Sequence, residues 1–219
     1  PGVRGPQTLH RQLGDEDQAV RLAAYESLIA LDDPIVQRNW FTNKAGTLKF
    51  VLDLVPSDVP LIYIAQSPVP RVVIFNTMLP VTSDRLISMW DNRLMLGTDK
   101  TNLMKVFYQQ PGQVASEQAE CLPLVANLVY LMGHRSTLEH PMAGFDMTFS
   151  QVTNVLYTLH EEGKVKSDLE LQINPLARAL ALQPETSPHG MRPEFGKVTM
   201  PTIGLHPGNS GIAIPERQN

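Results

Sequence analysis

Two histidines and a glutamate lie close together in the stretch GHRSTLEHP, residues 133–141. Imidazole and carboxylate groups bind zinc readily, so His134, Glu139 and His140 are candidate metal ligands. Their spacing matches no usual zinc pattern, however, and the sequence offers no clear further ligand. The single cysteine, Cys121, also excludes a cysteine-based zinc cluster and an intramolecular disulfide. We therefore interpret these residues as part of a loop and expect no metal site.

A candidate nucleophile, Ser210, lies in the glycine-rich stretch HPGNSGIAIP at residues 206–215. Its Gly-Asn-Ser-Gly quartet resembles the nucleophile loop of some chymotrypsin-like serine proteases. That chemistry requires a histidine base, an orienting carboxylate and a rigid oxyanion hole. Ser210 stands instead in a terminus rich in proline and glycine, and the strands before it are too few for two β-barrels. We favour turn-forming residues and keep a hydrolase that uses Ser210 as the second alternative function.

Acidic side chains form two groups, at residues 15–17 and at Glu161 and Glu162. Both groups fall at the ends of expected helices, where such residues have a structural or a solvated role. The chain has no G-x-G-x-x-G or G-x-x-x-x-G-K-[ST] motif for binding phosphates. We therefore expect no catalytic residues and no cofactor, and we do not expect an enzyme.

The composition predicts a folded chain with a real core. Of its 219 residues 42% are hydrophobic and 18% are charged, a composition typical of a folded chain rather than a disordered one. A net charge of −4 gives no general attraction to nucleic acid or to anionic lipid. No apolar run approaches the roughly 18 residues of a membrane helix, so we expect no membrane insertion. The chain begins at Pro1 without a methionine, so we expect an excerpt or a processed form.

The N-terminal segment predicts a pair of helices. Residues 6–13 form a short helix, and residues 13–34 resemble one helix of a helical repeat of the HEAT type, with Asp15 and Gln18 as its capping pair and Pro34 at its end. A repeat of this kind normally needs about three or more copies. We expect this one to be the last or only unit of a helical adaptor, with one flank on the short helix and the other on Trp40, Phe41 or another chain.

Strands follow from about residue 47, where the apolar period changes from 3.6 to 2. The stretch TLKFVLDLV predicts a half-buried strand, with Lys49, Val51 and Asp53 on its polar side. PLIYIAQ, RVVIFN and NLMKVFYQQ predict further strands, and Asp91 and Asn92 form the bend of a hairpin. We expect one small, mostly antiparallel sheet of five or six strands.

Two helices and a short strand close the expected fold. Residues 123–133 form the first helix. The second begins with a capping box of Thr148 and Gln151, continues with an apolar stripe and ends at Gly163. The fold class is therefore α+β, with a HEAT-like helical unit at 1–45, an α+β domain at 46–174 and a tail rich in proline and glycine at 175–219 that is extended or disordered.

The second of these helices also allows a nucleic-acid interpretation. The stretch TFSQVTNVLYTLHEEGKVKSDLELQ resembles the recognition helix and wing of winged-helix regulators. A recognition helix needs cations for phosphates, yet none lies between Thr148 and His160, and Glu161 and Glu162 add repulsion. An amphipathic helix packed on a sheet is the favoured interpretation. A winged-helix-like nucleic-acid-binding domain remains the first alternative.

Aromatic residues outside the expected core indicate where a protein partner would bind. Trp40 and Phe41 follow the helical unit, and Trp90 precedes the hairpin bend. Aromatic side chains at such positions serve as core or interdomain contacts more often than as partner contacts. If a surface of this chain binds a partner, we expect it around Trp40 and Phe41, with Trp90 as a further candidate.

The order of these elements, with the pair PLIYIAQ and PRVVIFN and the stretches KVFYQQPG and LYTLHEEGKV, resembles a known family over roughly residues 10–173. It looks like the C-terminal extension of flagellar basal-body P-ring proteins of the planctomycete type. The resemblance implies a structural role without catalysis in a periplasmic ring around the rod, with self-association or other basal-body components as partners. The ring-forming body of that family has no counterpart in these residues. Conversely, the tail after Asn174 has no counterpart in the family.

Overall fold

Four helices and nine strands make up the described part of the computed structural model, which comprises residues 4–82, 85–98, 102–138 and 141–172. The helices are α1 (Arg4–Gln12), α2 (Gln18–Ala30), α3 (Val125–Gly133) and α4 (Phe149–Glu161). The strands are β1 (Gln37–Thr42), β2 (Leu48–Val55), β3 (Leu61–Ala65), β4 (Arg71–Phe75), β5 (Ile87–Met89), β6 (Leu94–Thr98), β7 (Met104–Tyr108), β8 (Glu117–Cys121) and β9 (Asp168–Leu171). The tail expected at 175–219 and the candidate nucleophile Ser210 lie outside the described residues.

The strands form two sheets. A five-stranded sheet has the order β1-β2-β4-β3-β9, in which the β2–β4 and β3–β9 pairs are parallel and the other two pairs are antiparallel. A four-stranded sheet has the order β5-β6-β7-β8 and is antiparallel throughout. The α+β class is confirmed. The strands divide between two sheets where the sequence predicted one, because their pairings depend on contacts that no local pattern encodes.

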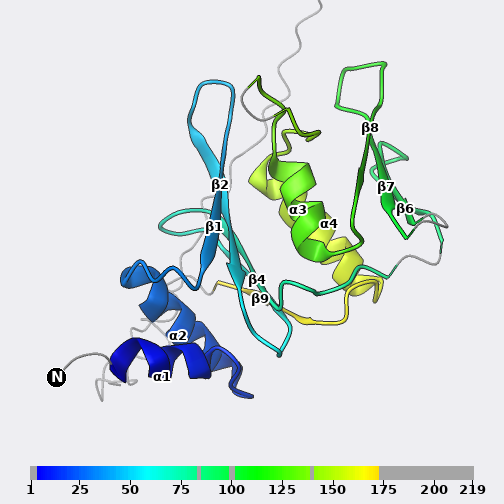
Figure 1. Cartoon of the computed structure of the whole chain (residues 1–219). Coiled ribbons are helices and arrows are strands. Elements are labelled where there is room, and N and C mark those ends of the chain that lie inside the picture. Colours follow the sequence, from blue (N-terminus) through cyan, green and yellow to red (C-terminus); the bar gives the residue numbers. More distant parts are fainter. Residues whose placement is uncertain (1–3, 83–84, 99–101, 139–140, 173–219) are drawn as a thin grey trace, which may run out of the picture. The chain divides into compact units, whose positions relative to one another are not determined.

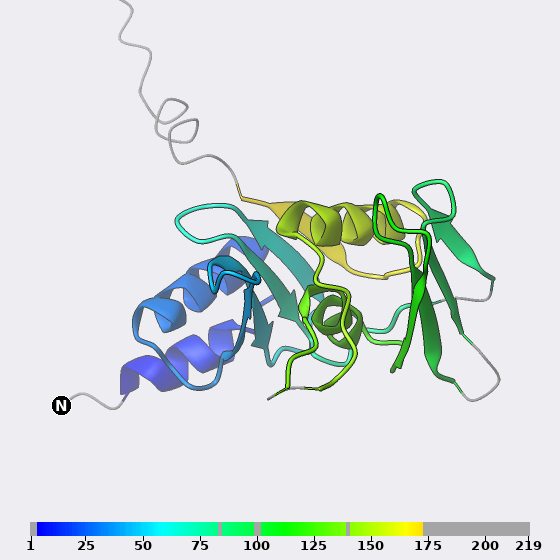
Figure 2. The same cartoon turned by 90° about the horizontal axis from the view of Figure 1, so that it is seen from above.

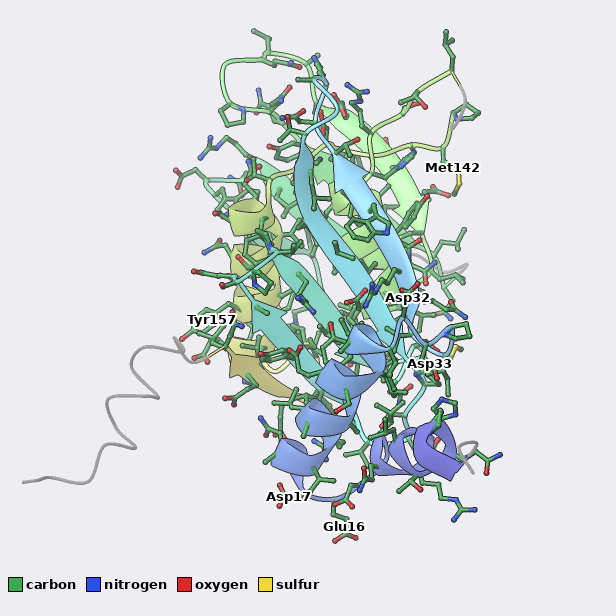
Figure 3. The ribbon with its side chains drawn as sticks, turned by 90° about the vertical axis from the view of Figure 1, so that its left-hand side faces the viewer. Glu16, Asp17, Asp32, Asp33, Met142 and Tyr157 are labelled. Carbon is green, nitrogen blue, oxygen red and sulfur yellow. The ribbon has the colours of Figure 1, made fainter. Side chains whose placement is uncertain are left out.

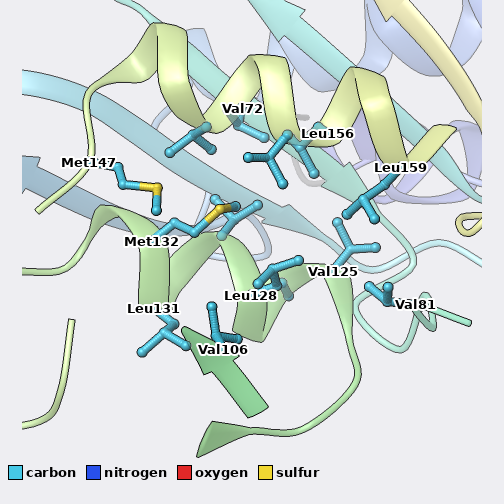
Figure 4. Packing of buried hydrophobic residues seen from close by; sticks show 14 of the residues in the cluster. Val72, Val81, Val106, Val125, Leu128, Leu131, Met132, Met147, Leu156 and Leu159 are labelled. Carbon is cyan, nitrogen blue, oxygen red and sulfur yellow. The ribbon is translucent and has the colours of Figure 1, made fainter. Parts of the chain in front are cut away.

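Helices cover both faces of the five-stranded sheet. On one face, residues of α2 share an apolar core with Val55, Leu61 and Phe75 of the sheet, and α1 packs beside α2. On the other face lie α3 and α4, and the four-stranded sheet packs against these helices from the far side (Figures 1 and 2). Figure 4 shows the larger core, where Val72 of β4, Leu156 of α4 and Val106 of β7 belong to one cluster.

Helix α4 has the local structure that its sequence predicts. The Thr148 side chain accepts a hydrogen bond from the backbone of Gln151, whose own side chain accepts from the Thr148 backbone, so the capping box is present. Gly163 follows the helix with a left-handed φ of 65°, as expected of a glycine after a helix end. The apolar stripe is fully buried in the larger core; its members are Val152, Val155, Leu156 and Leu159.

Helix α2 begins later than the sequence suggests. Its cap is Asp17, whose carboxylate accepts a hydrogen bond from the backbone of Ala19, so the prediction of Asp15 as the cap is wrong. Arg21 explains the shift: it is 2% exposed and donates hydrogen bonds to the backbone carbonyls of Asp15 and Glu16. The side chain therefore holds residues 15–16 as a separate turn in front of the helix.

The other flank of α2 lies on the sheet. Tyr25 and Leu28 are fully buried in the core that α2 shares with β2, β3 and β4. Phe41 belongs to the core on the opposite face, so of the three contacts expected for this flank, Trp40, Phe41 or another chain, the one with Phe41 is wrong. The boundary expected between residues 45 and 46 falls in the turn that joins β1 to β2, which pair along their length. The N-terminal helices and the sheet thus belong to one unit, Pro1–Asn174.

Candidate functional site

Strand β1 is the least protected edge of the two sheets. Edge strands expose unpaired backbone groups, and proteins usually protect them by shortness or by charged side chains. The other edges follow this rule: β5 has three residues, β9 has four with two acidic ones, and β8 carries Glu117 and Glu120. Strand β1 has six residues, its one charged side chain, Arg38, is held in ion pairs with Asp32 and Asp53, and within the described ranges only β2 pairs with it. Its outer backbone edge is therefore open to another strand.

Two aromatic residues of β1 point to opposite faces of the sheet. The Phe41 side chain is 4% exposed, and its ring centroid lies 4.8 Å from that of Phe50 and 5.6 Å from that of Tyr130. Phe41 thus anchors β1 in the core and presents no surface to a partner. Trp40 is 59% exposed on the other face, as the alternation of a strand requires. Figure 3 looks onto the five-stranded sheet from the side on which α2 packs, with β1 and β2 (blue) above α1 and α2.

Next to Trp40, a buried polar cluster joins α2 to the sheet. The hydroxyl of Tyr25 donates a hydrogen bond of 2.6 Å to the carboxylate of Asp53, and Arg71 donates to the Tyr25 hydroxyl oxygen at 3.4 Å. The second carboxylate oxygen of Asp53 accepts no hydrogen bond in the described part of the chain, but Arg38 Nε lies 3.5 Å from it. Asp53 is only 2% exposed, so its expected position on a solvent-facing side of β2 is wrong: α2 covers that face.

The electrostatics of this cluster follow from burial. Desolvation raises the pKa of Asp53, although the Tyr25 hydrogen bond and the two arginines oppose that rise. Burial, together with the negative charge of Asp53, also raises the pKa of Tyr25. A phenol held protonated against a covered carboxylate makes a strong structural link between helix and strand. The cluster therefore fixes α2 and β1 relative to the sheet.

A second feature is a small pocket beside the β5–β6 turn, here called the Trp90 pocket. It has a volume of about 180 Å³ and is lined by Trp90, Arg93, Tyr108, Gln109, Pro111 and Gln151. The Trp90 indole N–H donates to the side chain of Asn154 on α4 at 2.8 Å, and its ring meets that of Tyr108 edge-on at a centroid distance of 6.3 Å. Trp90 is half-buried in the turn that joins β5 to β6 of the four-stranded sheet, whereas Trp40 lies on β1 of the other sheet.

The remaining candidates from the sequence do not form a site within the described residues. His134 is 9% exposed and stacks on the Tyr130 ring, whereas Glu139 and His140 lie outside the described ranges. No group of three potential metal ligands occurs in the described part of the chain. Burial raises the pKa of the Cys121 thiol to about 11. None of the described helices has the length and apolar character to cross a bilayer.

The exposed face of α4 offers little to nucleic acid. Ser150, Asn154, Tyr157 and Glu161 are its exposed side chains, and Glu162 follows directly. No lysine or arginine occurs in α4, and acidic groups at its end repel phosphates.

Comparison with protein-family models, with curated proteins and with solved structures finds no match to this chain. The P-ring resemblance therefore stays a prediction from the sequence.

Sequence reasoning found Trp40 and Trp90 but missed what surrounds them. It left residues 37–42 without a strand, because the polar run QRN hides the alternation that begins at Trp40. It also missed Arg93, in the turn just before β6, and Tyr108 on β7, which come near each other only once β6 and β7 are paired. The alternation of Met104, Val106 and Tyr108 could have placed Tyr108 on the inner face of β7.

Proposed function

We propose that this chain is a non-enzymatic protein-interaction module of a structural assembly and that the edge of β1 is its contact with a partner protein. The observation that carries the proposal is Trp40, which is 59% exposed on an open six-residue edge strand. Tryptophan is enriched among residues that dominate binding energy at protein interfaces, and an indole left in water at a sheet edge has much apolar area to bury.

The expected mode of binding is strand addition. An extended segment of the partner lies along β1 and pairs with its outer backbone groups, while a pocket or ring of the partner covers Trp40. Phe41 supports this mode, because its burial between Phe50 and Tyr130 holds β1 rigidly against the core. Arg38, two residues before Trp40 and so on the same face of β1, forms a 3.5 Å ion pair with exposed Asp32 and adds polar groups at the rim. The edge is thus preorganised, which lowers the entropic cost of binding.

The family resemblance supplies the specific form of this proposal. It suggests that the assembly is the flagellar P-ring, that the compartment is the periplasm, and that the partner is a second copy or another basal-body component. The support for this step is the order of sequence elements over roughly residues 10–173, and the case for β1 as a contact does not depend on it.

Site-specific photo-crosslinking tests the proposal. A photoreactive phenylalanine derivative replaces Trp40 in the full-length protein, in the cells that make it, and adducts are identified by mass spectrometry. The matched control carries the same group at Tyr157, which is 50% exposed on helix α4 and belongs to no strand (Figure 3). We expect protein adducts at position 40 and few at position 157.

The identity of the adduct separates the two levels of the proposal. An adduct with a second copy, or with a ring or rod protein, supports the P-ring form of the proposal. Adducts with unrelated proteins refute that form but still support the role of the chain as an interaction module. Equal labelling at positions 40 and 157, or nucleic acid as the main adduct, refutes the role of β1.

A further inference from the structure

The Trp90 pocket combines ring walls with hydrogen-bond donors that other described residues leave unused. Arg93 donates through Nε to the Trp90 carbonyl at 3.0 Å, and its two terminal nitrogens form no hydrogen bond or ion pair with any described residue. The Tyr108 hydroxyl accepts a bond of 3.1 Å from the side-chain amide of Gln151, and no described residue accepts its proton. Two donors, one of them cationic, thus line one pocket, an arrangement that suits an anion.

The walls are held in place before any ligand arrives. Trp90, Asp91 and Asn92 all have left-handed backbone conformations, with φ values of 54°, 57° and 66°. This conformation is unfavourable for a bulky residue such as Trp90 and persists only where the surroundings impose it. Here Arg93 holds the Trp90 carbonyl and Asn154 holds its indole N–H. The turn therefore fixes the indole as a rigid wall.

The charge and shape of the pocket favour a singly charged anion with an apolar body. Arg93 is the only cation among the lining residues, and exposed Glu117 pairs with Tyr108 across β7 and β8, so a dianion would meet repulsion. The rings of Trp90, Tyr108 and Pro111 offer apolar contact instead. We propose that the Trp90 pocket binds the carboxylate of an organic acid or of a peptide, with Arg93 and Tyr108 as the donors and Trp90 as the stacking wall.

Nuclear magnetic resonance of the two indole N–H groups tests this site. The chain has two tryptophans, so the Trp40 signal serves as an internal control, and a Trp40→Phe variant assigns it. The probes are sodium benzoate and its neutral analogue benzamide, at constant ionic strength. We expect benzoate to shift the Trp90 signal saturably with a millimolar Kd, and we expect neither a shift of Trp40 nor saturation by benzamide. An acidic peptide and acetate then distinguish a peptide source from a small acid.

Variants assign the interaction to its donors. Arg93→Gln weakens benzoate binding about tenfold or more, because a hydrogen bond to a charged group is worth roughly 1.5–3 kcal/mol. Arg93→Lys keeps the charge and weakens benzoate binding by an intermediate amount. It therefore tests the role of the charge even if the glutamine variant misfolds. Glu117→Gln strengthens binding about twofold by removing the opposing charge. Arg11→Gln, at an exposed position on α1, leaves the Kd unchanged.

Three results overturn the proposal. One is an equal response to benzoate and benzamide, which means apolar packing alone. Another is saturation by inorganic phosphate but not by benzoate. The third is the absence of a saturable Trp90 shift at roughly 100 mM benzoate, a hundredfold above a millimolar Kd. None of these results tests the role of β1, so the pocket proposal can be refuted while the proposed function is supported, and the reverse.

Discussion

Replacing Tyr25 with phenylalanine removes the hydrogen bond that links α2 to the five-stranded sheet. The Tyr25 hydroxyl donates to Asp53 at 2.6 Å, and the two residues are 0% and 2% exposed. The substitution leaves the ring in place and takes away a single oxygen. Asp53 then keeps only the 3.5 Å approach of Arg38 and the more distant charge of Arg71.

The expected cost follows from the chemistry of a buried carboxylate. A hydrogen bond to a charged group contributes roughly 1.5–3 kcal/mol, and no water replaces the lost donor at so covered a site. We therefore expect the Tyr25→Phe substitution to lower the free energy of unfolding by about 2–3 kcal/mol at pH 7. That is a large share of the 5–15 kcal/mol typical of a folded domain.

The loss of unfolding free energy caused by Tyr25→Phe must also depend on pH. Because burial raises the pKa of Asp53, the folded state holds its proton more tightly than the unfolded state does. Stability therefore falls as the pH rises from about 3.9, the ordinary value for Asp, through the raised pKa of the folded protein. The Tyr25 hydrogen bond limits that rise in pKa, so the variant loses more stability over the same range. Near pH 3, where Asp53 is neutral, the cost shrinks to about 1 kcal/mol.

Urea unfolding followed by circular dichroism at pH 3 and pH 7 measures both effects. Tyr63→Phe is the matched control: Tyr63 lies in the same core, and its hydroxyl has no hydrogen bond to any described residue. We expect the control to change stability by less than about 0.5 kcal/mol. A Tyr25→Phe cost below that of the control, or one that does not change with pH, would refute the view that this bond holds α2 to the sheet.

Three further predictions concern other parts of the fold. Gly133→Ala places a Cβ atom 2.5 Å from a core phenylalanine ring and should cost about 1–3 kcal/mol in urea unfolding, whereas Gly14→Ala, whose nearest neighbouring atom lies 3.8 Å away, should be near neutral. A backbone N–H and His10 hold the pKa of Asp33 below its ordinary value, so its carboxylate stabilises the fold above about pH 4 and loses this effect as the pH falls through the lowered pKa. The stability difference between wild type and Asp33→Asn should therefore narrow below about pH 4, and a constant difference would contradict the assignment. The Cys121 thiol, with its pKa raised to about 11, should react with a disulfide reagent at pH 8 at least tenfold more slowly than free cysteine does, and an equal rate would mean that the thiol is not desolvated.

Helix α4 shows what the sequence could predict. Its capping box, buried stripe and terminal glycine are all local features, because each joins residues within one or two turns. The hairpin around Asp91 and Asn92 is local in the same sense, and both residues lie in the bend. Where the determining contacts are near in sequence, the pattern of residue types suffices.

The elements that the sequence missed depend on distant partners. Strand β8, with the sequence EQAEC, has Ala119 as its only buried apolar residue and forms by pairing with β7. Asp53 looked like a solvent-facing residue, and it is buried because Tyr25, 28 residues earlier, covers it. The candidate site was predictable only in part. The sequence indicated that Trp40 lies outside the core, but the open edge of β1 beside it follows from the order of the strands in the sheet.

Amide hydrogen exchange across β1 tests the central claim most directly. The partner captured through position 40 is expressed with the unmodified protein, and exchange is compared with and without it. Strand addition predicts that the alternate amides of Gln37–Thr42 whose N–H groups point away from β2 exchange at least tenfold more slowly in the complex, while those of β8 and β9 do not change. Unchanged exchange in β1, with protection instead on α4 or on another edge, would contradict the account.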